Sequence, residues 1–227
     1  MLPRHASSRT TKRLPDIHCT ASGRRAGKIK KENAVVDDPL VLILMYFVVP
    51  LWLLAGFADW LCHRASHIET TSGPKESVLH LLQFAEVGVA LLAALFLEIN
   101  AGVLAFMIVM FFVHEATALW DVRYAVAERS VTPIEQHIHS FLEMLPLIAI
   151  ICLSALHWDQ FKALFGFGPD PSRFTLAWKA EPLPLAYLMA LMVAALLLAI
   201  IPFAEELYRG VRARRVRTRN DANACRP

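Results

Sequence analysis

Imidazole and carboxylate side chains recur at helical spacing in the first half of this 227-residue sequence. Asp59, His63 and His67 follow one another at i, i+4 and i+8, which places them on one face of a helix if the helix extends that far. Glu76 and His80 form a second i, i+4 pair. Imidazole nitrogen and carboxylate oxygen together suit iron, manganese or zinc. Both groups are therefore candidate metal ligands.

The next stretch of the chain repeats this pattern of spacing. His114 and Asp121 are i, i+7, and Glu135, His139 and Glu143 are i, i+4, i+8. Four helices would then each direct a nitrogen and an oxygen ligand toward a shared interior, as facing helices do in di-metal bundles. The sequence predicts a site for two metal ions, with iron favoured and zinc as the alternative.

A short internal repeat supports the pairing of these helices. Residues 74–80 and 133–139 both read Pro-x-Glu-x-x-x-His, and each opens the returning helix of a predicted hairpin. The same residues are also common at the start of helices for structural reasons alone. Pro suits the first helical position, and Thr132 and Glu135 have the spacing of a capping box. Glu135 and Glu76 are thus either metal ligands or caps.

Several polar residues nearby are candidates for a supporting role or a proton relay: Gln83, Glu86, Glu115 and His137. Glu86 lies ten residues after Glu76, a rise of roughly 15 Å, which is near the middle of a bilayer. A carboxylate at that depth costs several kcal/mol unless it is paired, metal-bound or protonated. Glu86 is therefore a deep ligand, a relay, or a protonated group hydrogen-bonded across helices.

The elements that must position these side chains are apolar helices. The chain is 56% hydrophobic and 19% charged, with a mean hydropathy of +0.44, which is too apolar for one ordinary soluble domain. Five stretches are long enough to cross a hydrocarbon core of about 30 Å: 39–58, 76–97, 101–120, 139–158 and 183–204. We predict an all-α, polytopic membrane bundle of about five transmembrane helices, with the ligand cluster at one end.

Basic residues are concentrated in the two ends of the chain. Residues 1–38 hold nine of the 23 Lys and Arg, and residues 205–227 hold seven. No basic face runs through the middle, so nucleic-acid binding is not expected. We predict a disordered basic tail over 1–38, a transmembrane domain over 39–204 and a basic cytoplasmic tail over 205–227.

The arginine run over 209–219 directly follows the last apolar stretch, which predicts a cytoplasmic carboxyl end. The metal site would then face the cytoplasm, in a bacterial inner (plasma) membrane. Arg64, Arg123 and Arg129 fall in the two loops on that side and most simply set the topology. One of them would alternatively hold an anionic headgroup or a donor protein.

The motif His63-Arg64-Ala65-Ser66-His67 is HxxxH. In this, the chain resembles the histidine-rich integral-membrane di-iron oxygenases of the fatty-acid hydroxylase and desaturase type, over about residues 59–143. The sequence has no HxxHH motif, so carboxylates would complete the ligand set. The resemblance implies two irons that activate O₂, a lipid-like substrate from the membrane, and oxidation by hydroxylation or desaturation. An external electron donor is expected, because no Rossmann or flavin fingerprint is present.

Other classes of membrane protein also fit the pattern. A zinc-dependent hydrolase resembling the alkaline-ceramidase type would use His63, His67, His80 and Asp121 to activate a water molecule. A b-type cytochrome would use two histidines as axial ligands, although the neighbouring carboxylates would then have no role. A metal carrier is a further non-enzymatic alternative.

Overall fold

A computed structural model describes residues 38–224 of the protein. Apart from one isolated β-bridge between Leu97 and Trp178, these residues form helices and connecting loops only. Five helical segments are long and apolar enough to cross a membrane: Pro39–Ala65, Pro74–Phe96, Ala101–Glu128, Pro133–Leu156 and Leu185–Ala224. The predicted all-α membrane bundle is therefore confirmed, and the protein is an integral membrane protein.

The first and last spans are each built from consecutive segments. The first comprises α2 (Pro39–Ile43), the π-helical turn η1 (Leu44–Val48) and α3 (Val49–Ala65), and the last comprises α8 (Leu185–Ala195), η2 (Leu196–Ile200) and α9 (Ile201–Ala224). Between them lie α4 (Pro74–Phe96), α5 (Ala101–Glu128), α6 (Pro133–Leu156) and the short α7 (Trp158–Leu164). The tail predicted over 1–38 lies outside the described residues except for Asp38, whose side chain caps α2.

Helix starts occur where the sequence pattern placed them. Pro74 and Pro133 both occupy the first turn of their helices, where a missing N–H costs nothing. The Thr132 hydroxyl accepts a hydrogen bond from the Glu135 N–H, at 3.2 Å. The Asn100 side chain caps α5 by accepting from the two N–H groups of Gly102 and Val103. The two parts of the internal repeat thus begin equivalent helices.

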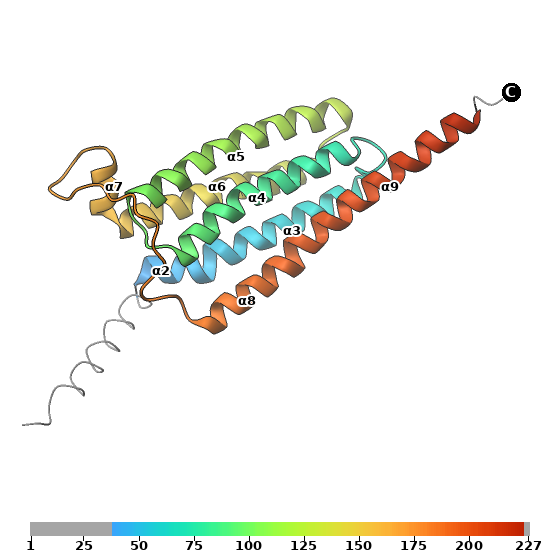
Figure 1. The fold of residues 1–227 in the computed structure, drawn as a ribbon. Helices are drawn as coiled ribbons and strands as arrows, with labels where there is room; N and C mark the ends of the chain where they lie inside the picture. Colours follow the sequence, from blue (N-terminus) through green and yellow to red (C-terminus); the bar gives the residue numbers. More distant parts are fainter. Residues whose placement is uncertain (1–37, 225–227) are drawn as a thin grey trace, which may run out of the picture. The chain divides into compact units, whose positions relative to one another are not determined.

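The helices pack in a closed ring. Helix α3 contacts α6 and α9, α4 contacts α5 and α9, and α5 contacts α6. In Figure 1 these helices run side by side, and the loops α3–α4 and α5–α6 lie at the same end, from which α9 projects. Each helix therefore has one face toward a common interior, and the ends that carry the predicted ligands meet.

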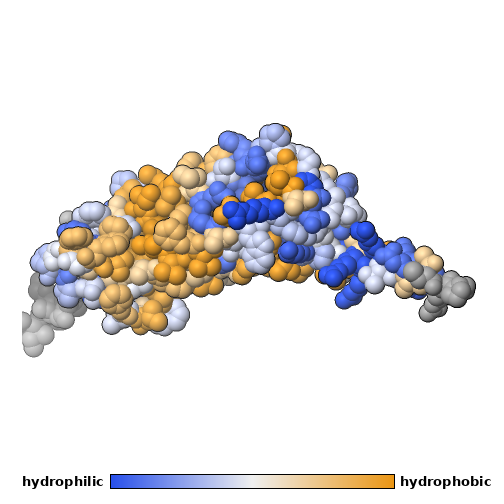
Figure 2. All heavy atoms as spheres, turned by 90° about the horizontal axis from the view of Figure 1, so that it is seen from above, coloured by the Kyte–Doolittle hydropathy of each residue, from blue (hydrophilic) through white to orange (hydrophobic). Residues whose placement is uncertain are grey.

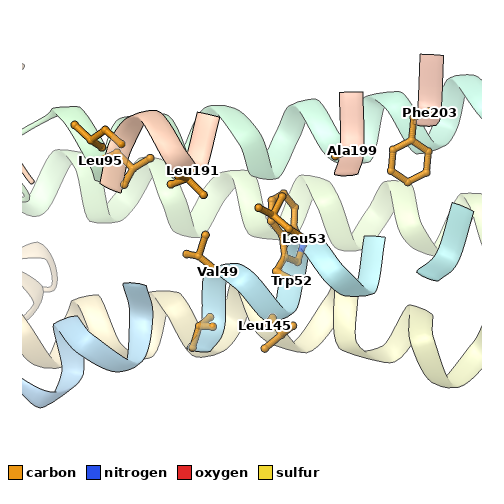
Figure 3. Close-up of a cluster of buried hydrophobic side chains, with 10 residues drawn as sticks. Val49, Trp52, Leu53, Leu95, Leu145, Leu191, Ala199 and Phe203 are labelled. Carbon is orange, nitrogen blue, oxygen red and sulfur yellow. The ribbon is translucent and has the colours of Figure 1, made fainter. Parts of the chain in front are cut away.

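Apolar side chains fill the interior away from the ligand-bearing end. Figure 3 shows Trp52 and Leu53 of α3 beside Leu145 of α6, with Leu191, Ala199 and Phe203 contributed by the last span. Many large apolar side chains remain exposed on the outside of the bundle, and Figure 2 shows them as a broad hydrophobic surface. Hydrophilic side chains gather toward the end where α9 leaves the bundle. This distribution suits a bundle whose outer surface contacts lipid.

Candidate metal centre

Two imidazole rings from different helices lie stacked inside the ligand-bearing end. The rings of His63 on α3 and His80 on α4 have centroids 4.2 Å apart and planes 8° from parallel. Behind them lies the carboxylate of Glu206 on α9, with one oxygen 3.1 Å from Nδ1 of His63 and the other 2.8 Å from Nδ1 of His80. All three residues are at most 5% exposed. One carboxylate therefore orients both rings.

The opposite nitrogens of the two rings face further carboxylates. Nε2 of His63 lies 3.5 Å from Asp59 and 3.4 Å from Glu135. Nε2 of His80 lies 3.2 Å from Asp121 and 3.9 Å from Glu76. A histidine that donates Nδ1–H to a carboxylate and keeps Nε2 free is oriented as metal-binding histidines are. Each Nε2 atom therefore lies among carboxylate oxygens, where it could either bind a metal ion or donate a hydrogen bond.

The spacing of the donor atoms fits metal ions. Ligand atoms of His63, Glu76 and Glu135 lie within 4.8 Å of one another. Those of His63, His80 and Glu206 do so as well, on the side of the rings where Glu206 contacts both Nδ1 atoms. Several buried polar atoms around them have no hydrogen-bond partner of normal geometry: Asp59 Oδ1, His80 Nε2, Asp121 Oδ1 and His139 Nε2. Unpartnered buried polar atoms are costly, and a bound cation would provide partners for them.

Charge balance agrees with this assignment. The interior holds the carboxylates of Asp59, Glu76, Asp121, Glu135 and Glu206, all at most 3% exposed. The guanidinium of Arg129 is the cation that contacts two of them. Five carboxylates and one guanidinium leave four negative charges, which either bound divalent ions or protonated imidazoles of His63, His80 and His139 would offset. Burying this charge without cations would be strongly unfavourable.

Arg129 closes the outer side of the cluster. Its Nη2 lies 2.6 Å from Glu76 and also contacts Glu135, whose other oxygen lies 3.0 Å from Nη1. Burial alone would lower the pKa of Arg129, but the hydrogen bonds to Glu135 and Glu76 raise it above its ordinary value. Besides the topology role predicted for it as a loop residue, Arg129 therefore forms an ion pair with both Glu76 and Glu135. Its side chain is 4% exposed and joins the two halves of the internal repeat.

A second polar layer lies deeper in the bundle. Thr117 donates a hydrogen bond to Glu86 at 2.9 Å, and Nδ1 of His114 lies 3.8 Å from the other oxygen of Glu86. His114 is 3% exposed, and neither ring nitrogen has a hydrogen-bond partner of normal geometry. His139 lies between the layers, with Nδ1 3.8 Å from Asp59. Glu86 thus accepts a hydrogen bond across helices, from Thr117 of α5.

A cavity of about 40 Å³ opens between this layer and the imidazoles. Its polar lining comes from Asp59, His80, Gln83, His114 and His139. Its apolar lining comes from Trp52, Leu53, Gly56, Phe84, Leu142, Ala199 and Phe203.

The structure brings most of the predicted ligands into this interior: Asp59, His63, Glu76, His80, His114, Asp121, Glu135 and His139, with Gln83 and Glu86 beneath. Glu135 is both cap-bonded through its N–H and turned inward through its carboxylate, so the two alternatives for it coexist. Glu115 and Glu143 are only partly buried, and no direct contact joins them to the stacked pair.

Two predicted residues lie outside the cluster. The stripe of Asp59, His63 and His67 requires α3 to continue, but the helix ends at Ala65 and His67 takes a left-handed backbone with φ of 52°. The His67 side chain is 74% exposed and lies 3.4 Å from Glu69. His137 is exposed and packs against Phe141, as its position about 200° around the helix from His139 requires.

Glu206 was not among the predicted ligands, because the last span was expected to end at Ala204 and a basic cytoplasmic tail to follow. Instead α9 continues to Ala224. The buried positions Phe203, Glu206 and Gly210 recur at i, i+3 and i+7, which is a signal that the helical period continues. Gly210 permits the close approach, since a Cβ there would lie 3.1 Å from Cα of Pro74.

Comparisons of the chain with protein-family models, curated proteins and solved structures find no match. The chemistry of the donor set and the geometry of the bundle interior are therefore the basis for a functional proposal.

Proposed function

We propose that this protein is an integral-membrane metalloenzyme, a non-haem di-iron oxidoreductase that uses O₂ to hydroxylate, desaturate or otherwise oxidise an apolar, lipid-like substrate. The observation that carries the proposal is the stacked pair His63 and His80, held from behind by Glu206. Two imidazoles oriented by one carboxylate, each with Nε2 beside further carboxylates, form two adjoining half-sites.

The donor chemistry favours iron. Imidazole mixed with several carboxylates suits iron, manganese or zinc, whereas copper(I) and iron–sulfur clusters require thiolates or thioethers. Paired iron in a helical bundle is typically held by two histidines and several carboxylates. The residues around His63 and His80 match that set, with Asp59, Glu135, Asp121 and Glu76 as the oxygen donors.

When bound, the iron pair would supply activation of O₂. The protein's own residues would do the rest: Glu206 keeps the two imidazoles in register, and Arg129 holds Glu76 and Glu135 in place while balancing part of their charge. The apolar walls below the imidazoles keep bulk water away from the reacting groups.

The partners follow from the setting of the site. An apolar substrate would enter from the membrane lipid around the bundle. Electrons would come from a separate donor, and the arginines of α9 next to the site mark the end of the bundle that we assign to the cytoplasm of a bacterial inner membrane. The Glu206 carboxylate lies one turn before the first of these arginines, Arg209.

The alternative classes fit this geometry less well. A zinc hydrolase built on His63, His67 and His80 needs His67, which is 74% exposed. A haem between His63 and His80 has no room, because their rings are 4.2 Å apart. A metal carrier needs the same metal ligands as a metalloenzyme. The two classes are distinguished by measuring catalytic turnover.

The test is metal content and O₂ use by the purified full chain in detergent or nanodiscs. We expect about two irons per chain after iron-replete expression, and O₂ consumption that depends on an added reductant. The double variant His63→Ala/His80→Ala should lose iron, whereas His67→Ala should keep it. One zinc and no iron, or iron retained in the double variant, would refute the di-iron site.

A further inference from the structure

We propose that the cavity beneath the imidazoles is the binding pocket of a small, dioxygen-sized co-substrate, and that Gly56 keeps this pocket open. This inference rests on the proposed function, which requires O₂, and adds where O₂ binds and what limits its size. The pocket adjoins the candidate metal centre directly, because Asp59 and His80 belong to both.

The volume selects for a very small ligand. A cavity needs about 10–15 Å³ to hold one water molecule, so about 40 Å³ accommodates a molecule of two or three non-hydrogen atoms. An acyl chain is far larger than this. The pocket therefore fits the second reactant and does not hold a whole acyl chain.

The cavity lining suits O₂, which is apolar when it binds and acquires negative charge when it is reduced. Trp52, Phe84 and Phe203 supply aromatic surface around most of the cavity, which favours an uncharged, weakly polar occupant. At the other side, the polar lining comes from the Gln83 amide, which lies beside the Asp121 carboxylate, and from the buried ring of His114. The second N–H of the Gln83 amide, which Asp121 does not use, is the donor that would stabilise negative charge developing on a ligand.

Gly56 leaves free space in the pocket, because the side chains opposite it do not fill the volume that a Cβ would occupy. A Cβ placed at Gly56 would lie 3.9 Å from a methyl carbon of Leu142 and 4.0 Å from the ring of Phe203. These are ordinary van der Waals separations, so alanine fits without a clash and occupies space that glycine leaves free. A leucine would extend farther into the cavity. Gly88 on α4 is a matched control, since a Cβ there meets nothing within 4 Å.

Xenon is a suitable probe, since it is uncharged, small and independent of metal and turnover. The experiment measures xenon binding to the full-length protein by ¹²⁹Xe NMR, for wild type, Gly56→Ala, Gly56→Leu, Gly88→Ala and Gly88→Leu. We expect saturable binding in wild type, about tenfold weaker binding in Gly56→Ala and none in Gly56→Leu. Both Gly88 variants should bind as wild type does. Thermal melting and metal content identify any variant that does not fold.

Oxygen dependence is the second measurement on the iron-loaded protein. Gly56→Ala should raise KM for O₂ by about tenfold with unchanged iron content and little change at saturating O₂. Absence of xenon binding in wild type would indicate a pocket that holds ordered water only and would overturn the inference, as would equal binding in Gly56→Leu. If xenon binding follows the expected series but no variant consumes O₂, the proposed function fails while the small-ligand pocket stands.

Discussion

Glu206 and His80 are linked by a 2.8 Å contact between a carboxylate oxygen and Nδ1, although they lie on helices far apart in the sequence. The other oxygen of Glu206 contacts Nδ1 of His63 in the same way. Because both imidazoles share one partner, neither ring can turn without losing that contact. The orientation of the two Nε2 atoms is therefore decided by a residue that need not touch a metal through its own oxygens.

Removal of the Glu206 charge should weaken metal binding. Glu206→Gln preserves shape, but it replaces one of the two acceptor oxygens with an amide donor, so only one imidazole keeps an acceptor. Loss of such an orienting partner typically costs 10–100-fold in metal affinity, and we expect a loss of about this size. Metal titration of the chelator-treated protein measures it. Glu205→Gln is the matched control, because Glu205 pairs with Arg64 and Arg209 at the surface instead. Equal affinities for the two variants would contradict an orienting role.

His63→Ala and His67→Ala should differ in their effect on metal affinity. His63 is 2% exposed and lies among three carboxylates, whereas His67 is 74% exposed in a turn. We expect His63→Ala to lower metal affinity at least about 100-fold, and His67→Ala to leave it unchanged. Elemental analysis of both proteins after identical purification gives the comparison. A lower metal content in His67→Ala would contradict this and would mean that the turn after α3 contributes to the site.

Arg129 should contribute strongly to the stability of the metal-free protein. Arg129→Gln leaves Glu76 and Glu135 buried together without their shared cation, and broken buried ion pairs cost about 3–5 kcal/mol. Arg129→Lys should recover only part of this, since an ammonium cannot contact both carboxylates as a planar guanidinium does. Unfolding followed by circular dichroism in mild detergent measures the loss. Arg123→Gln, at an exposed position on α5, should change the free energy of unfolding by less than about 0.5 kcal/mol.

Metal removal should lower the melting temperature, and metal addition should restore it. A ligand that binds only the folded state adds about 2.7 kcal/mol at a concentration 100 times its Kd. The measurement is thermal melting of the full chain with chelator, and then with excess iron(II) or zinc. In His63→Ala/His80→Ala the added metal should give no such increase. An equal increase in that variant would place the stabilising metal elsewhere.

Sequence alone determined the helices and the end of the bundle at which the predicted ligands gather. Long apolar stretches predicted five spans, and prolines with following acids predicted the starts of α4 and α6. These features are local: a helical period, a cap and a length that matches a bilayer can each be recognised from neighbouring residues. The i, i+4 pairs of Asp59 with His63 and Glu76 with His80 also follow from the period, and both are in contact.

Tertiary structure alone decided which ligands meet. Glu206 joins the site because α9 packs against both α3 and α4, and Arg129 joins because α5 ends between Glu76 and Glu135. His67 is excluded because α3 stops two residues before it. Sequence spacing fixes the angle of a side chain around its own helix, but the rotation and relative height of neighbouring helices depend on the packing of all their contacting side chains at once. Convergence of donor atoms from five helices is a property of that packing.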